Sequence, residues 1–255
     1  ALQKHGITME TFDLADVFHR VGSVSASGAA YKDKAQTLSC YSDFSKMPAE
    51  SFDKLVKLAV VIDAIIEEAK LDAVAIRCWV EMQQILNISP CVVLSELNNR
   101  KVTAACEVDV GNAVAMHALS KASDNVAACL DWNNNYGNDR NKCILFHCGP
   151  VPQSMMSKKG RVTDHSILAN AVGPGCSFGC NVGRIAPTDF TFSSMMTDSG
   201  RLKFFVGEGK FTADHIPDEF FGCAGVAEIP KLQHVLLHIG RNGHRHDVSV
   251  TTVHV

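Results

Sequence analysis

The pattern of apolar and polar positions divides the chain into two parts with different rhythms. Up to about residue 135, stretches with apolar residues three and four apart alternate with short continuous apolar runs. The first pattern is typical of amphipathic helices and the second of buried strands. Beyond residue 140 the helical spacing gives way to short strand-like runs separated by Gly, Pro, Asn and Asp.

In the first part, "METFDLADVFHRV" is expected to begin extended and to become helical near Asp13. The segment "PAESFDKLVKLAVVIDAIIEEAKL" predicts a long helix with Pro48 in its first turn. Further helices are predicted over "VEMQQIL", "PCVVLSELNNR" and "GNAVAMHALSKAS", and strands over "DAVAIRCW", "KVTAACEVDV" and "NVAACLDWN". This alternation of strands and helices predicts an α/β domain, a parallel sheet flanked by helices.

In the second part, strands are predicted over "KCILFHCG", "HSILANAV", "GRIAPTDFTFSSMMT", "GRLKFFVGEG" and "HVLLHIG". Many short strands in succession indicate an antiparallel, barrel-like sheet. The polar segment "NNNYGNDRN" lies between the two patterns. The sequence therefore predicts an α/β central domain over residues 1–135 and a β-rich C-terminal domain over residues 136–255.

Composition narrows the class of protein. The chain has 255 residues, of which 46% are hydrophobic and 20% charged, as in globular proteins. Its net charge is -3, and no run reaches the roughly 18 apolar residues of a membrane span. We therefore expect neither a nucleic-acid nor a membrane partner. The ten cysteines lie mostly in apolar runs, which indicates reduced, buried thiols in a cytoplasmic protein.

Two short features bear on the extent of the chain and on metal binding. The sequence has no initiator Met, and its last residues, "HDVSVTTVHV", alternate like a strand that stops without a turn. Both observations predict a piece of a longer protein. Cys176 and Cys180 bracket "SFG" in a Gly-rich loop, which is only weak support for zinc. That loop lacks the Lys and Ser/Thr of a phosphate-binding loop.

Acidic residues directly follow two of the predicted strands. Glu107 and Asp109 come after "AAC", and Asp131 comes after "AACL". Ligands of open α/β sheets bind at the carboxyl ends of strands, so these acids are placed where a site is expected. Glu107 has the alternative of a solvated strand-end acid, and Asp131 that of a turn residue before "NNNYG". For Asp109 we prefer the N-cap of the helix that begins near Gly111 over a catalytic role.

Several motifs taken together carry a resemblance to a known family. In chain order they are "RCW", "ACEVD", the strand-end Asp131, "HCG" and the terminal "GHRHDV". Over most of its length the chain resembles the L-fucose and L-arabinose isomerase superfamily, and more narrowly the fucose isomerase-like proteins. The resemblance implies the family's central and C-terminal domains, with its first domain absent and its last strands cut short. It also implies a homo-oligomer.

The resemblance implies a divalent metal held by Glu107, Asp131 and His246. Mn²⁺ is expected first, with Mg²⁺ and Co²⁺ as alternatives, since carboxylate oxygens suit hard cations and Mn²⁺ also accepts an imidazole. The family commonly has two adjacent histidines where this chain reads "HRHD", so His244 is the alternative to His246. Glu107 and Asp131 are also the implied catalytic pair, one as base and one as acid, with the assignment open.

Three further residues are candidates for substrate binding. Arg77 and Trp79 follow a buried strand, where a guanidinium next to an aromatic wall suits sugar oxygens. Pairing of Arg77 with a structural acid is an equal alternative. His147 in "HCG" matches a histidine that binds metal or substrate in relatives. A nucleophilic role for Cys148 has no support from the family.

The activity implied by the resemblance is aldose–ketose isomerisation through an enediolate, assisted by the metal. The first alternative is a non-catalytic sugar-binding or regulatory relative. The second is a related metal-dependent enzyme that acts on another polyol or on an acid sugar. Because family sites are built in oligomers, we expect this chain alone to have little activity.

Overall fold

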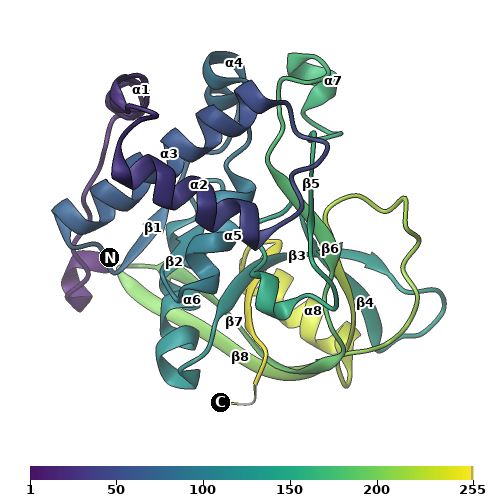
Figure 1. Cartoon of the computed structure of the whole chain (residues 1–255). Helices are drawn as coiled ribbons and strands as arrows, with labels where there is room; N and C mark the ends of the chain where they lie inside the picture. The colour runs from purple at the N-terminus through teal and green to yellow at the C-terminus, as the bar shows by residue number, and fades with distance from the viewer. Residues whose placement is uncertain (254) are drawn as a thin grey trace.

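The computed structural model describes residues 1–253 and 255, and it contains two sheets of unequal size (Figure 1). The helices are α1 (Leu14–Ser23), α2 (Ala29–Tyr41), α3 (Ala49–Ala69), α4 (Glu81–Leu86), α5 (Cys91–Asn99), α6 (Val110–Ser123), α7 (Ala169–Val172) and α8 (Leu232–Arg241), with 3-10 turns η1 (Leu2–His5) and η2 (Gln153–Met155). The strands are β1 (Ala73–Ala75), β2 (Thr103–Ala105), β3 (Ala127–Asn135), β4 (Lys142–His147), β5 (Arg161–Thr163), β6 (Cys180–Arg184), β7 (Thr188–Asp198), β8 (Arg201–Phe211), β9 (Cys223–Glu228) and β10 (Asp247–Thr251).

The N-terminal helices pack around α3 and cover the small sheet, which consists of β1 and β2 in parallel (Figure 1). Asp13 caps α1 as its position predicts, accepting a hydrogen bond from the Ala15 N–H at 2.8 Å. Along α3 the residues Leu55, Leu58, Ile62 and Ile65 recur three and four apart and are buried, which is why this segment forms the central helix of the layer. Within the described residues, no helix has the length and apolarity to cross a membrane.

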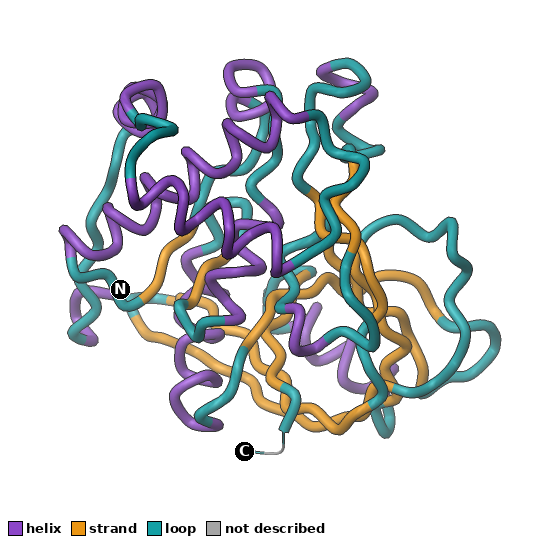
Figure 2. Tube along the Cα trace, viewed as in Figure 1, coloured by secondary structure: helices purple, strands orange, loops and turns teal. Residues whose placement is uncertain are grey.

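The large sheet has eight strands in the order β4-β3-β10-β7-β8-β9-β6-β5. Figure 2 shows the strands in orange, mostly in the lower half of the view. All neighbours are antiparallel except β6 and β9. β4 also pairs with β9, which curls the sheet back on itself. However, β8 meets β9 only at Lys210 and Phe211, so the sheet is not a closed barrel. Its interior is filled by buried side chains that include Leu130, Leu145, Phe190, Phe192 and Val248.

Helix α6 packs against both sheets. Met116 and Leu119 of this helix are buried together with Ala105 of β2 and with Ala127 and Cys129 of β3. The apolar face of one helix therefore fixes the end of the small sheet relative to the strands of the large one. This packing brings the residues that precede α6 close to β3 and β10.

The predicted helix-flanked parallel sheet is much smaller than expected. "AACLDWNNN" forms β3 as predicted, but β3 pairs antiparallel with β4 and β10 in the large sheet. A short apolar run fits either kind of sheet, so its pattern did not reveal the partner. The predicted boundary at residue 135 falls between β3 and β4, and the division into domains 1–135 and 136–255 stays a prediction.

Three other segments differ from prediction. "HVLLHIG" lies in helix α8, whose buried residues Leu232 and Ile239 are two turns apart. "HSILANAV" contains the single helical turn α7 rather than a strand. Helix α2 was not predicted, because Leu38 is its one fully buried residue in the described structure and the apolar stripe is weak. Short apolar runs are ambiguous between strand and helix, which explains the first two errors.

Candidate functional site

The two strands of the small sheet end next to a cavity of about 380 Å³. Because β1 and β2 are parallel, their carboxyl ends lie at the same edge, and the loops that follow them meet there. The cavity is lined by Arg77, Cys78, Trp79, Glu107 and Val108. Three residues predicted from the sequence, Arg77, Trp79 and Glu107, are thus brought together.

Glu107 has an unusual backbone. Its φ is 60° and that of Val108 is 56°, so two successive residues with side chains occupy the left-handed region. This conformation costs roughly 1–2 kcal/mol per residue, and such residues cluster at functional sites. It is held by hydrogen bonds from the Val108 N–H to the Ile76 carbonyl at 3.2 Å and from the Asp109 N–H to the Cys106 carbonyl at 2.9 Å.

Asp131 lies in β3 of the large sheet, and its carboxyl group is close to the ring of His246, another of the three predicted metal ligands. The distance from His246 Nε2 to Asp131 Oδ1 is 3.4 Å, and the Trp132 N–H donates to the His246 carbonyl at 2.8 Å. Burial raises the pKa of Asp131 to about 6, with the negative charge of Glu107 adding to the rise and His246 opposing it. The charges of Glu107 and Asp131 therefore interact. The prediction that both acids follow strands of one parallel sheet was wrong, since Asp131 belongs to the antiparallel pairing of β3 with β4 and β10.

The three predicted ligands fit a divalent cation in their chemistry. The negative charge of Glu107 raises the pKa of Asp131, a repulsion that a cation near both would relieve, and the set of two carboxylates and an imidazole suits Mn²⁺. In the part of the chain that the structure describes, the one group whose ligand atoms all lie within 4.8 Å of one another is Asp109, Cys129 and Asp247. Glu107, Asp131 and His246 are therefore more widely spaced than that group.

The two terminal histidines have different surroundings. The ring of His244 packs edge-on against Phe205 with centroids 4.6 Å apart, and partial burial lowers the pKa of His244. The His246 side chain is 68% exposed and approaches Asp131. The structure thus presents His246, rather than His244, to the candidate site.

His147 ends β4 and is buried, with 4% of its surface exposed. Its Nδ1 accepts a hydrogen bond from the Cys148 N–H at 2.8 Å, which places the proton of the neutral ring on Nε2. Burial, together with the neighbouring His165 and His246, lowers the pKa of His147 to about 4. The ring is therefore a neutral hydrogen-bond donor at pH 7, near the His246 side of the site.

Arg77 combines both roles that its sequence position allowed. Its Nη2 pairs with Glu81 Oε1 at 2.7 Å, and its Nε donates to the Trp79 carbonyl at 3.2 Å. The guanidinium side chain is nevertheless 62% exposed and lines the cavity next to Trp79, whose indole is 43% exposed. An acid partner and an exposed face are compatible with contacts to a ligand.

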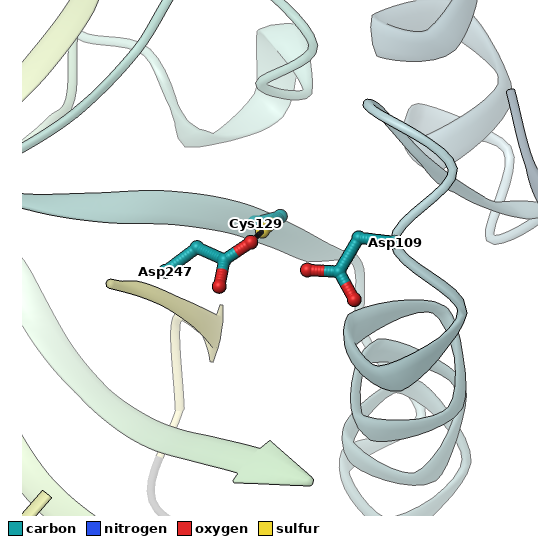
Figure 3. A group of neighbouring side chains, drawn as sticks. All are labelled: Asp109, Cys129 and Asp247. Carbon is teal, nitrogen blue, oxygen red and sulfur yellow. Dashed lines mark hydrogen bonds between the residues drawn. The ribbon is translucent and has the colours of Figure 1, made fainter. Parts of the chain in front are cut away.

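Asp109 is the N-cap of α6, as predicted, and its Oδ1 accepts from the Asn112 N–H at 2.9 Å. The sequence reasoning missed Asp247, which is 5% exposed and whose carboxyl group faces that of Asp109 (Figure 3). Burial and Asp109 together raise the pKa of Asp247 to about 8. Its position in "HDVSV" gave one available signal, an acid at the start of a strand that is buried throughout.

Comparison with known proteins shows what this chain is similar to. The model of the family "L-fucose isomerase, C-terminal domain" matches residues 145–255, a region that contains His147 and His246. The sulfoquinovose isomerase of Alkalicoccus urumqiensis is 28% identical over 158 residues, which cover 62% of this chain and 34% of that protein.

The sulfoquinovose isomerase of Clostridium sp. (strain MSTE9) is 22% identical over 227 residues, 89% of this chain and 49% of that protein. The sulfoquinovose isomerase of Priestia aryabhattai is 24% identical over 136 residues, which cover 53% of this chain and 30% of that protein. The matches thus span about a third to a half of the length of these relatives. Residues 145–255 match the model of the L-fucose isomerase C-terminal domain, and the resemblance of the chain to fucose isomerase-like proteins is confirmed.

Proposed function

We propose that this chain carries the metal-binding and proton-transfer residues of an aldose–ketose isomerase. The observation that supports it best is the pairing of Asp131 with His246, whose Nε2 lies 3.4 Å from Asp131 Oδ1, together with the charge of Glu107 acting on the same carboxyl. The family match and the sulfoquinovose isomerase relatives point to the same reaction class.

The reaction needs a proton to leave the carbon next to a carbonyl and to return to the neighbouring carbon. Glu107 and Asp131 are the candidates for holding this proton, and a carboxyl with a pKa of about 6 exchanges protons readily near neutral pH. When bound by Glu107, Asp131 and His246, a divalent cation, Mn²⁺ first, supplies positive charge for the oxygens on which negative charge develops in the enediolate. The Nε2–H of neutral His147 is the proposed donor to a substrate oxygen.

The cavity favours a sugar with an acidic group as substrate, alongside the L-fucose or L-arabinose type. The relatives are named for sulfoquinovose, a sugar with a sulfo group, and Arg77 offers an exposed guanidinium beside the Trp79 ring. A guanidinium pairs well with planar or tetrahedral oxyanions, and an aromatic face packs against sugar C–H groups. Non-catalytic sugar binding is the alternative function.

Metal binding tests this proposal directly. Isothermal titration with Mn²⁺ is expected to show one ion per chain, and Glu107→Gln and Asp131→Asn are each expected to weaken binding at least a hundredfold by removing a charged ligand. Glu10→Gln, which changes an exposed acid elsewhere, serves as the matched control. The proposal is wrong if the unaltered chain binds Mn²⁺ no better than Glu107→Gln does.

Turnover separates the two functions. The chain is assayed with L-fucose, L-arabinose and sulfoquinovose in the presence of Mn²⁺. Ketose formation that disappears in Glu107→Gln supports the isomerase. Saturable binding of a sugar without any ketose formation supports the non-catalytic alternative.

A further inference from the structure

An ion pair links the loop of Glu107 to the segment of His246. Arg245 Nη1 lies 3.1 Å from Asp109 Oδ1, and the Asp109 side chain is almost fully buried while that of Arg245 is 55% exposed. Arg245 directly precedes His246, and Asp109 follows Glu107 by two positions. The contact therefore joins two proposed metal ligands that reach the site from different sheets.

A second set of hydrogen bonds runs parallel to this ion pair. Asn112 Nδ2 donates to Asp109 Oδ2 at 2.8 Å, and the Ser249 hydroxyl donates to Asn112 Oδ1 at 2.7 Å. Since the Asn112 N–H also donates to Asp109 Oδ1, both carboxylate oxygens of Asp109 are engaged. The start of α6 is thereby tied to Arg245, which lies just before β10, and to Ser249 within β10.

The buried acids beside this link do not form a second metal site of their own. Asp109, Cys129 and Asp247 converge (Figure 3), with ligand atoms within 4.8 Å of one another. However, Arg245 already supplies a positive charge to Asp109, and a second cation there would be repelled. The arrangement is that of a buried carboxylate held by a guanidinium.

We propose that Arg245 is a positioning residue for the metal site, acting through Asp109. This inference rests on the proposed function. The left-handed backbone of Glu107 and Val108 is costly and has to be imposed by its surroundings. Asp109 fixes the C-terminal side of this turn by capping α6, and Arg245 fixes Asp109 relative to His246. Loss of the ion pair is expected to leave the ligands present but misplaced.

The decisive variant is Arg245→Gln, because two explanations predict opposite signs for it. Removing a positive charge close to a cation site strengthens cation binding if only the electrostatic field matters. Loss of positioning weakens it. We expect the Mn²⁺ dissociation constant to rise about tenfold in Arg245→Gln and to recover partly in Arg245→Lys, which keeps the charge without the planar fork.

Two further variants complete the test. Arg241→Gln, in an exposed residue at the end of α8, is the matched control and is expected to retain or slightly improve Mn²⁺ affinity. Asp109→Asn keeps a capping side chain and removes a charge beside Asp247, so it is expected to fold with an unchanged circular dichroism spectrum. If Asp109 and Arg245 act through one contact, losing both residues costs no more than losing one of them. The double variant Asp109→Asn/Arg245→Gln is therefore expected to bind Mn²⁺ no more weakly than the weaker-binding of the two single variants.

The outcomes distinguish this inference from the proposed function. If the unaltered chain binds no Mn²⁺, the proposed function fails and the positioning role fails with it. If the unaltered chain binds Mn²⁺ and folded Arg245→Gln binds it equally well or more tightly, the positioning role alone is overturned.

Discussion

At the scale of single residues, two sequence neighbours differ in exposure, since the His246 side chain is 68% exposed and Asp247 is 5% exposed. Glu107, Asp131 and His246 are visible in the sequence because each stands beside an apolar strand or within a motif of the family. Arg245 and Asp247 flank His246 and looked like ordinary surface residues. Asp247 lies in β10, which packs against α6 and is buried along its whole length, and the alternating letters of "DVSVT" do not reveal this burial.

Burial of a histidine leads to a prediction about acid stability. His165 is 1% exposed, its ring lies 5.0 Å from that of Phe221, and burial lowers its pKa to about 4. An unfolded histidine takes up its proton near pH 6.5. Between about pH 6.5 and 4 the unfolded state therefore binds one more proton at this residue, so the free energy of unfolding falls as the pH is lowered.

We expect His165→Asn to remove this contribution, about a tenfold change in the folding equilibrium constant per pH unit within that window. Asn keeps an acceptor for the Leu168 N–H, which His165 Nδ1 accepts at 3.3 Å. Urea unfolding at several pH values measures the slope, and exposed His234→Asn is the control. An identical slope in His165→Asn and the unaltered chain would contradict the prediction.

At the scale of elements, the type of most helices and strands was predictable and their partners were not. The regular spacing of α3 and the alternating β8 were read correctly. α8 was mistaken for a strand, because "HVLLHIG" is too short for periodicity to decide. β3 was given the wrong sheet, since pairing depends on contacts far along the chain.

The hairpin of β7 and β8 depends on a small residue opposite an aromatic one. Gly207 of β8 pairs with Phe192 of β7, and a Cβ at Gly207 would lie 2.3 Å from the Phe192 ring. Because Phe192 is buried, its ring has little room to move. We expect Gly207→Ala to lower the free energy of unfolding by about 1–3 kcal/mol.

The matched control is Gly22→Ala in α1, where a Cβ meets nothing within 4 Å. Alanine in an open helical position is expected to raise stability by about 0.5–1 kcal/mol. Thermal unfolding of both variants measures the difference. Equal effects of the two substitutions would show that the Gly207–Phe192 contact does not limit the hairpin.

For the molecule as a whole, the open question is whether the β-rich part folds alone. The family match begins at residue 145 and the predicted domain at residue 136, yet β3 (Ala127–Asn135) lies between β4 and β10 in the sheet. A piece comprising residues 136–255 would expose both strand edges and lose Leu130 from the core.

We expect the 136–255 piece to unfold without a cooperative transition, whereas the full chain shows one. Circular dichroism during heating measures both. A sharp transition in the shorter piece would instead support the division at residue 135 predicted from the sequence.

If Glu107 and Asp131 hold a cation as proposed, their attachment to different sheets bears on which ion the site would prefer. The spacing of the two carboxylates then depends on how the two sheets pack together through α6, whose Met116 and Leu119 are buried with Ala105 of β2 and Cys129 of β3. Cations differ in radius, and Mg²⁺ requires shorter oxygen distances than Mn²⁺ or Ca²⁺. Ionic selectivity in this protein would then be decided by the size of apolar side chains that never touch the ion.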